Sequence, residues 1–154
     1  MIKKNVVEVL KEKKLTITTA ESCTGGLIAA SIVNIPGASA VFKEGYITYS
    51  NEAKMKLLGV KQETLEKYYA VSKETAFEMA QGGAKNAGAD VCVAVTGVAG
   101  PDMEDGKPVG LVYVSCCYNG RVEVRECNFK GDRTQIRVQA ANAALDLALD
   151  MVCG

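Results

Sequence analysis

The sequence contains no histidine among its 154 residues. This absence excludes the Ser-His-Asp and Cys-His catalytic arrangements, and with them the histidine-containing zinc site of nucleobase deaminases. Any general base in this chain must therefore be lysine, aspartate, glutamate, tyrosine or water. The missing residue type constrains the chemistry more than any residue that is present.

The chain also has no excess of charge of either sign and no long apolar run. It has 18 lysines and arginines against 18 aspartates and glutamates, so no overall field attracts nucleic acid or anionic lipid. No apolar run approaches the roughly 18 residues of a membrane helix, and the first residues lack the apolar core of a signal peptide. We therefore expect a cytoplasmic protein that acts on a small molecule, with neither nucleic acid nor membrane as a partner.

The six cysteines include no C-x-x-C pair. A chain of this length can form one apolar core without crosslinks, so we expect a single domain over residues 1–154. We interpret five of the cysteines as small buried apolar side chains and keep Cys23 as a candidate nucleophile.

Apolar residues at helical spacing alternate along the chain with β-branched runs that have the period of strands. The expected helices span residues 3–14, 24–35, 50–59, 61–68, 72–89 and 132–152. The expected strands span residues 15–20, 42–50 and 90–97, followed by a hairpin over 111–131 that turns at Asn119-Gly120. This order predicts a three-layer α/β/α sandwich with a mixed sheet.

Two polar stretches, "ESCTGG" (21–26) and "TGVAGPD" (96–102), lie at the carboxyl ends of expected strands. Ligands of open α/β sheets usually bind at this edge. Threonine hydroxyls and glycine amides at a helix start suit an anion such as phosphate. Neither stretch is a Walker A or dinucleotide motif, so for an isolated Thr-Gly-Gly helix capping by Thr24 and tight packing are the better explanation.

Without histidine, a serine nucleophile needs another base, and a desolvated lysine is the documented alternative. Lys54 stands out because "TYSNEAK" surrounds it with groups that could orient it. A second arrangement would use the Cys23 thiol with Glu21 and Lys54. Both remain open at this point, as does a purely structural role for the thiol.

Arg133 and Arg137 lie four residues apart in the last expected helix and should share one face. Such a pair could clamp a carboxylate or phosphate, or could form surface ion pairs. The acids of "PDMEDG" (101–106) have no metal-ligand spacing, so we expect no metal.

Six motifs together carry a resemblance to a known family: "TAESCTGG", "GYITYSNEAK", "AVSKET", "VAVTGVAGPD", "KPVGLVYV" and "GDRTQIR". In this order they resemble the CinA C-terminal domain family of competence/damage-inducible proteins, whose stand-alone members are nicotinamide mononucleotide deamidases. The resemblance implies hydrolysis of the carboxamide of nicotinamide mononucleotide to nicotinate mononucleotide and ammonia, a step of pyridine nucleotide salvage, without a metal or cofactor. Many members carry a further N-terminal domain similar to molybdopterin-binding proteins, and we do not expect its activity here.

The resemblance also implies roles for individual residues. Ser39 would be the nucleophile, Lys54 its base and Tyr49 the group that relays or orients the proton. Ser22 remains the alternative nucleophile because it lies in the more distinctive motif. The residues expected to bind substrate are Ser22, Thr24, Gly25, Thr96, Gly97 and Arg137, with Arg137 placed to meet an anionic group.

Two questions stay open at the level of sequence. The same pocket could belong to a non-catalytic, nucleotide-binding regulatory module. The alanine-rich stretch 140–152 could supply a packing face for a homodimer as readily as for the core.

Overall fold

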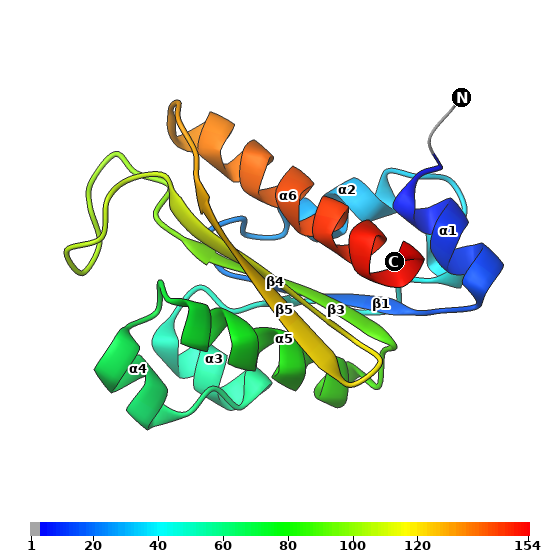
Figure 1. Ribbon diagram of the computed structural model, residues 1–154, viewed down its shortest axis with the longest axis horizontal. Helices are drawn as coiled ribbons and strands as arrows, with labels where there is room; N and C mark the ends of the chain where they lie inside the picture. Colours follow the sequence, from blue (N-terminus) through cyan, green and yellow to red (C-terminus); the bar gives the residue numbers. More distant parts are fainter. Residues whose placement is uncertain (1–3) are drawn as a thin grey trace.

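Five strands form one mixed sheet in the computed structural model, which describes residues 4–154 (Figure 1). The strands are β1 (Ile17–Glu21), β2 (Tyr46–Ile47), β3 (Val91–Gly97), β4 (Leu111–Tyr118) and β5 (Arg121–Asn128). Their order in the sheet is β2-β1-β3-β4-β5. The first three are parallel, whereas β4 and β5 are antiparallel to their neighbours.

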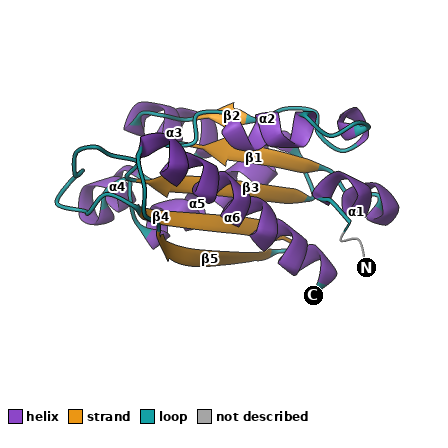
Figure 2. Cartoon of the chain, turned by 90° about the horizontal axis from the view of Figure 1, so that it is seen from above, coloured by secondary structure: helices purple, strands orange, loops and turns teal. Residues whose placement is uncertain are grey.

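Helices cover both faces of this sheet, which confirms the α/β/α sandwich (Figures 1 and 2). One face carries α1 (Val6–Lys13), α2 (Leu27–Val33) and α6 (Arg133–Cys153). The other carries α3 (Asn51–Leu58), α4 (Gln62–Tyr68) and α5 (Lys73–Ala87). None of the helices in residues 4–154 combines the length and the apolar character needed to cross a membrane.

The apolar strand β3 lies at the centre of the core. Side chains of a strand alternate between its faces, so Val93 packs toward α6 while Ala94 packs toward α5. Both faces are covered, which explains why the sequence of β3 is continuously apolar. The alanine-rich side of α6, including Ala140 and Ala144, packs into the same core.

Helix caps explain most of the observed helix starts. The side chains of Ser50, Ser72 and Asp132 each accept a hydrogen bond from a backbone N–H in the first turn of α3, α5 and α6. These starts agree with the expected ones, and so does the end of α3 at Gly59.

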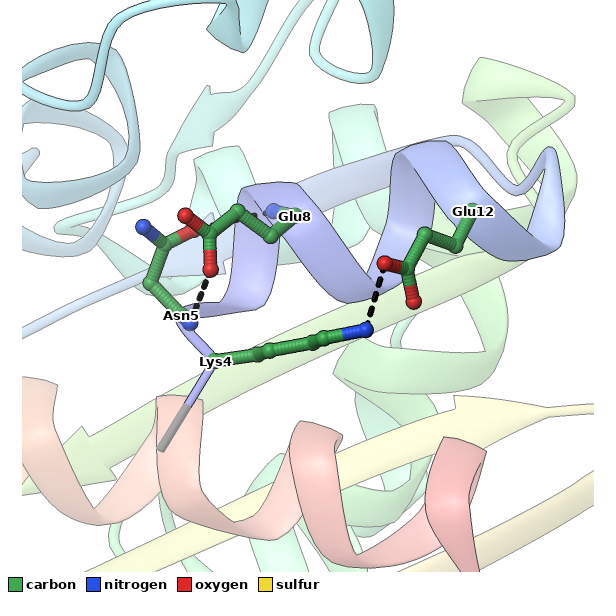
Figure 3. Close-up of polar contacts among 4 residues, drawn as sticks. All are labelled: Lys4, Asn5, Glu8 and Glu12. Atoms are coloured by element: carbon green, nitrogen blue, oxygen red, sulfur yellow. Dashed lines mark hydrogen bonds and ion pairs between the residues drawn. The ribbon is translucent and has the colours of Figure 1, made fainter. Parts of the chain in front are cut away.

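The first helix is capped in the same way. Asn5 and Glu8 form a reciprocal capping box, and Lys4 pairs with Glu12 along the helix (Figure 3). The expected start at residue 3 lies outside the described residues. The helix ends at Lys14 in a left-handed conformation, which turns the chain into β1.

The expected strand over residues 42–50 is reduced to the two-residue β2 at the edge of the sheet. Gly45 runs so close to β1 that a Cβ there would lie 2.5 Å from Thr19 Oγ1. The hairpin turn is as expected, since Asn119 and Gly120 both have positive φ angles, 53° and 76°.

The glycine pair in α5 is required by packing. A Cβ on Gly82 would lie 1.7 Å from the carbonyl oxygen of Leu58, so only glycine allows α5 to approach the end of α3 this closely. The sequence alone shows only the cost of two glycines within a helix. Their contribution is to hold α3 against the sheet.

The start of α2 differs from the expectation. The helix begins after Gly26, and Glu21 rather than Thr24 satisfies its first amides. The carboxylate of Glu21 is fully buried and accepts hydrogen bonds from the N–H groups of Gly26 at 3.2 Å, Ile28 at 2.8 Å and Ala29 at 3.0 Å. The protein's own anion therefore occupies this helix start, where the sequence suggested a phosphate site.

Replacement of Glu21 by Gln should lower the free energy of unfolding by about 2–3 kcal/mol, because an amide offers one acceptor oxygen where three backbone N–H groups converge on a buried side chain. Glu63→Gln is the control, since Glu63 is an exposed acid in the first turn of α4. It should change stability by no more than about 0.5 kcal/mol. Urea denaturation measures both variants, and equal effects would contradict the assigned role of Glu21.

Candidate functional site

A pocket of about 340 Å³ opens at the carboxyl ends of the three parallel strands. Ser22 follows β1, Tyr49 comes two residues after β2, and Gly97 ends β3; all three line the pocket. The remaining lining residues are Cys23, Arg133 and the segment from Val98 to Glu104. The site thus lies at the edge of the sheet that the sequence indicated.

Lys54 and Ser22 form a direct contact beside this pocket. Lys54 projects from α3, its side chain is 1% exposed, and its Nζ lies 3.0 Å from Ser22 Oγ. The same Nζ donates to the backbone carbonyl of Thr48 at 2.9 Å. Ser22 lines the pocket, whereas Lys54 is not among the residues that line it.

Burial lowers the pKa of Lys54 below its ordinary value of 10.5, while the charges of Glu104 and Cys23 act in the opposite direction. Within residues 4–154 no carboxylate forms an ion pair with Lys54. Burial therefore makes the neutral amine easier to reach than in an exposed lysine, and a neutral amine can accept the proton of the adjacent hydroxyl.

The structure does not bring Ser39 to Lys54. Ser39 is exposed in the short 3-10 helix η1 (Ala38–Ala40). The chain just after it, at Val41, accepts a hydrogen bond from Ile17 at the beginning of β1, whereas Ser22 follows the end of that strand. The expected pair of Ser39 and Lys54 is corrected to Ser22 and Lys54, because α2 carries the chain back to the opposite end of the sheet before Ser39 is reached.

The cysteine alternative lacks two of its requirements. Burial raises the pKa of Cys23 to about 12, so the thiol stays protonated at neutral pH. Glu21, its proposed partner, holds the start of α2 instead.

Arg137 holds the loop that carries Ser22. Its Nε donates to the carbonyl of Cys23 at 2.9 Å and its Nη2 to that of Thr24 at 2.8 Å. Gly25 packs against the same guanidinium, since a Cβ there would lie 3.4 Å from Nη2. The structure thus places Thr24, Gly25 and Arg137 in a contact that fixes the loop, where the sequence suggested substrate binding.

Thr96, which was also expected to bind substrate, is not among the residues that line the pocket. It is 1% exposed, and its hydroxyl donates to the carbonyl of Ala70 at 2.8 Å. This bond ties the end of β3 to the segment before α5. The neighbouring Gly97 does line the pocket.

Arg133 is the arginine that reaches the pocket. It is exposed, and its guanidinium donates to the hydroxyl of Tyr49 at 3.0 Å and to the carbonyl of Gly100. The spacing of Arg133 and Arg137 predicted a common face, but burial and the loop carbonyls decide which of the two remains available to a ligand.

The sequence analysis named the loop after β3 but gave no part in the site to Asp102, Met103 and Glu104, which line the pocket. The signal for their part was the length of that loop at a strand's carboxyl end. Residues 4–154 contain no group of three or more His, Cys, Asp or Glu side chains placed to hold a metal ion.

Replacement of Lys54 by Met should leave a folded protein whose stability relative to wild type increases as the pH falls below about 10.5. The pKa of Lys54 is lowered in the folded state, so the unfolded wild-type chain binds a proton more readily as the pH falls. Between the pKa values of Lys54 in the folded and in the unfolded chain, the difference in free energy of unfolding between the variant and wild type changes by at most about 1.4 kcal/mol per pH unit.

Urea denaturation across this pH range measures the difference, with Lys56→Met on the exposed side of α3 as the control. A difference between Lys54→Met and wild type that does not change with pH would contradict a lowered pKa of Lys54.

Comparison with known proteins places this geometry in a family. The model of the CinA C-terminal domain matches residues 1–152. A competence-damage inducible protein of Clostridium acetobutylicum is 60% identical over 138 residues, which are 89% of this chain and 34% of that protein. A CinA-like protein of Kosmotoga olearia is 57% identical over 142 residues, 92% of this chain and 34% of that protein. The chain thus spans about a third of the length of these relatives.

Solved structures agree with the sequence comparison. The competence/damage inducible protein of Agrobacterium tumefaciens superposes with a TM-score of 0.91 at 42% identity, over 94% of this chain and 90% of that one. A CinA superfamily protein of Klebsiella pneumoniae superposes with a TM-score of 0.92 at 36% identity, over 95% of this chain and 92% of that one. The chain belongs to the CinA C-terminal domain family.

Proposed function

We propose that this chain is an amidohydrolase that converts nicotinamide mononucleotide and water to nicotinate mononucleotide and ammonia, with Ser22 as the nucleophile and Lys54 as its base. The contact of 3.0 Å between Lys54 Nζ and Ser22 Oγ carries the proposal. It supplies the hydroxyl nucleophile with a base in a chain that has no histidine. The motifs that resemble the deamidases of this family support the choice of substrate.

The first half of the reaction forms an ester. Ser22 Oγ attacks the carboxamide carbon while its proton passes to the neutral Nζ of Lys54, which keeps its hydrogen bond to the carbonyl of Thr48. Lys54 then returns the proton to the amide nitrogen as the C–N bond breaks. Ammonia leaves, and the acyl group remains on Ser22.

The second half releases the acid. Water attacks the ester carbon, Lys54 accepts a proton from that water, and the C–O bond to Ser22 breaks as its oxygen takes the proton back. In each half the carbonyl oxygen becomes negatively charged. The backbone N–H of Cys23, which follows the nucleophile at the pocket wall, is the candidate donor to that charge.

Arg133 and Tyr49 are assigned to the nucleotide part of the substrate. The guanidinium of Arg133 lines the pocket and is exposed, and such a fork suits a phosphate. The hydroxyl of Tyr49 accepts a hydrogen bond from Arg133 and can form a further one, as donor or acceptor, with the same part of the substrate. A volume of about 340 Å³ is within the range of small-molecule sites.

Ammonia release from nicotinamide mononucleotide by metal-free protein tests the proposal. Ser22→Ala and Lys54→Met should each lower the rate at least 10³-fold, since each removes one member of the pair. Ser39→Ala and Cys23→Ala should retain activity within about threefold, because neither side chain takes part in the proposed steps.

Each inactive variant is checked for binding of the same compound by calorimetry. No ammonia from wild type would contradict the proposal, and wild type that binds without turnover would make the chain a nucleotide-binding module. Loss of activity in Ser39→Ala alone would return the nucleophile to Ser39.

The rate of deamidation should rise with pH as Lys54 loses its proton, with a midpoint below the 10.5 that is ordinary for lysine. Burial sets this direction, and Glu104 and Cys23 are the charged or titratable groups that oppose it. A profile of kcat against pH measures the midpoint. A rate that falls through the same range would contradict the role of Lys54 as a base.

A further inference from the structure

The pocket is lined by three charged residues, Asp102, Glu104 and Arg133. Arg133 contacts Gly100 and Tyr49. Glu104 lies close enough to Lys54 and Cys23 for its charge to raise the pKa of both groups. Glu104 and Ser22 thus line the same pocket, and of the two acids that line it Glu104 is the one whose charge acts on Lys54 and Cys23.

The backbone around Glu104 is held in a defined turn. Its N–H donates to the carbonyl of Lys107 at 3.2 Å, and the N–H of Lys107 donates back at 2.8 Å. Asp105 and Gly106 form the tip with positive φ angles of 51° and 73°. Lys107 in turn donates from its side chain to the carbonyl of Val71. This anchored turn presents Glu104 to the pocket and leaves Asp105 outside the pocket lining.

The substrate of the proposed function has charges of both signs. Its pyridine ring is a cation because the nitrogen bears the ribose, and the carboxamide to be cleaved is attached to that ring. Its phosphate is an anion at the far end. With the carboxamide at Ser22, the ring lies in the pocket that Glu104 also lines, and Arg133 is the cationic side chain of that pocket that remains for the phosphate.

We propose that Glu104 recognises the positive charge of the pyridinium ring and makes the site selective for N-substituted pyridinium carboxamides over neutral ones. This inference rests on the proposed function. It assigns a specificity role to a loop residue that lies outside the motifs carrying the family resemblance.

A cation beside Glu104 has a second consequence. In the free protein Glu104 raises the pKa of Lys54 and so opposes the neutral amine. A bound pyridinium pairs with that carboxylate and adds its own positive charge near Lys54, so both effects favour loss of the proton. The charged substrate thus promotes the form of the base that its hydrolysis needs.

Binding to variants without turnover tests the inference. Reduced nicotinamide mononucleotide is the matched probe, because its dihydropyridine ring is neutral while its carboxamide, ribose and phosphate are unchanged. In a Ser22→Ala background, adding Glu104→Gln should weaken binding of the oxidised compound about tenfold and change binding of the reduced compound less than twofold. Titration calorimetry gives the four dissociation constants.

Asp105→Asn in the same background is the matched control, because it removes one negative charge from the same turn outside the pocket lining. Asparagine also tolerates the positive φ of that position. It should leave both dissociation constants within twofold. An equal effect of Glu104→Gln on the two compounds, or no effect on either, would overturn the inference.

Measurements of turnover in proteins that keep Ser22 separate this inference from the proposed function. If wild type releases ammonia from the oxidised compound, the proposed function holds whatever Glu104→Gln does. The inference then requires that the ratio of kcat/KM for oxidised over reduced substrate falls about tenfold in Glu104→Gln, since the intrinsic reactivity of each ring cancels between variants. An unchanged ratio would overturn the inference alone.

Discussion

The contact between Lys54 and Ser22 is the constraint on which the rest of the site depends. It joins a side chain from α3 to the residue that follows β1, so both elements must be fixed at the same edge of the sheet. Gly82 allows α5 to press against α3, and Arg137 holds the carbonyls of the loop after Ser22. Neither Gly82 nor Arg137 lines the pocket, yet both fix the position of the pair, so they preorganise the site that the proposed function uses.

Lys54 is buried without an ion pair to any carboxylate of residues 4–154, which is unfavourable for folding but is what the proposed function requires. The charged amine loses its hydration at this position, and the hydrogen bonds to Ser22 and Thr48 offset only part of that loss. The same loss lowers the pKa and so supplies a base at a pH where an exposed lysine would be charged. Under the proposed function, stability and activity therefore make opposite demands on Lys54.

The sequence predicted most of the architecture because local signals agree with the tertiary structure. Capping residues, the Asn119-Gly120 turn and the apolar β3 each have a local physical cause. The site was harder to predict from the sequence than the fold, because its geometry depends on contacts between distant segments. Ser22 and Lys54 are 32 residues apart, and only the path of α2 shows that Ser22 rather than Ser39 meets Lys54. Arg133 and Arg137 are alike in sequence, and their roles separate only once the loop carbonyls are placed.

Mass spectrometry of the protein quenched during turnover of nicotinamide mononucleotide tests the Ser22–Lys54 account most directly. Trypsin releases residues 15–43 as one peptide, which contains Ser22, Cys23 and Ser39, so fragment ions must locate any acyl group within it. The account predicts a nicotinate mononucleotide ester on Ser22 that is absent from Ser22→Ala. An acyl group on Ser39 or Cys23, or ammonia release without any acyl-enzyme under conditions that slow its hydrolysis, would contradict it.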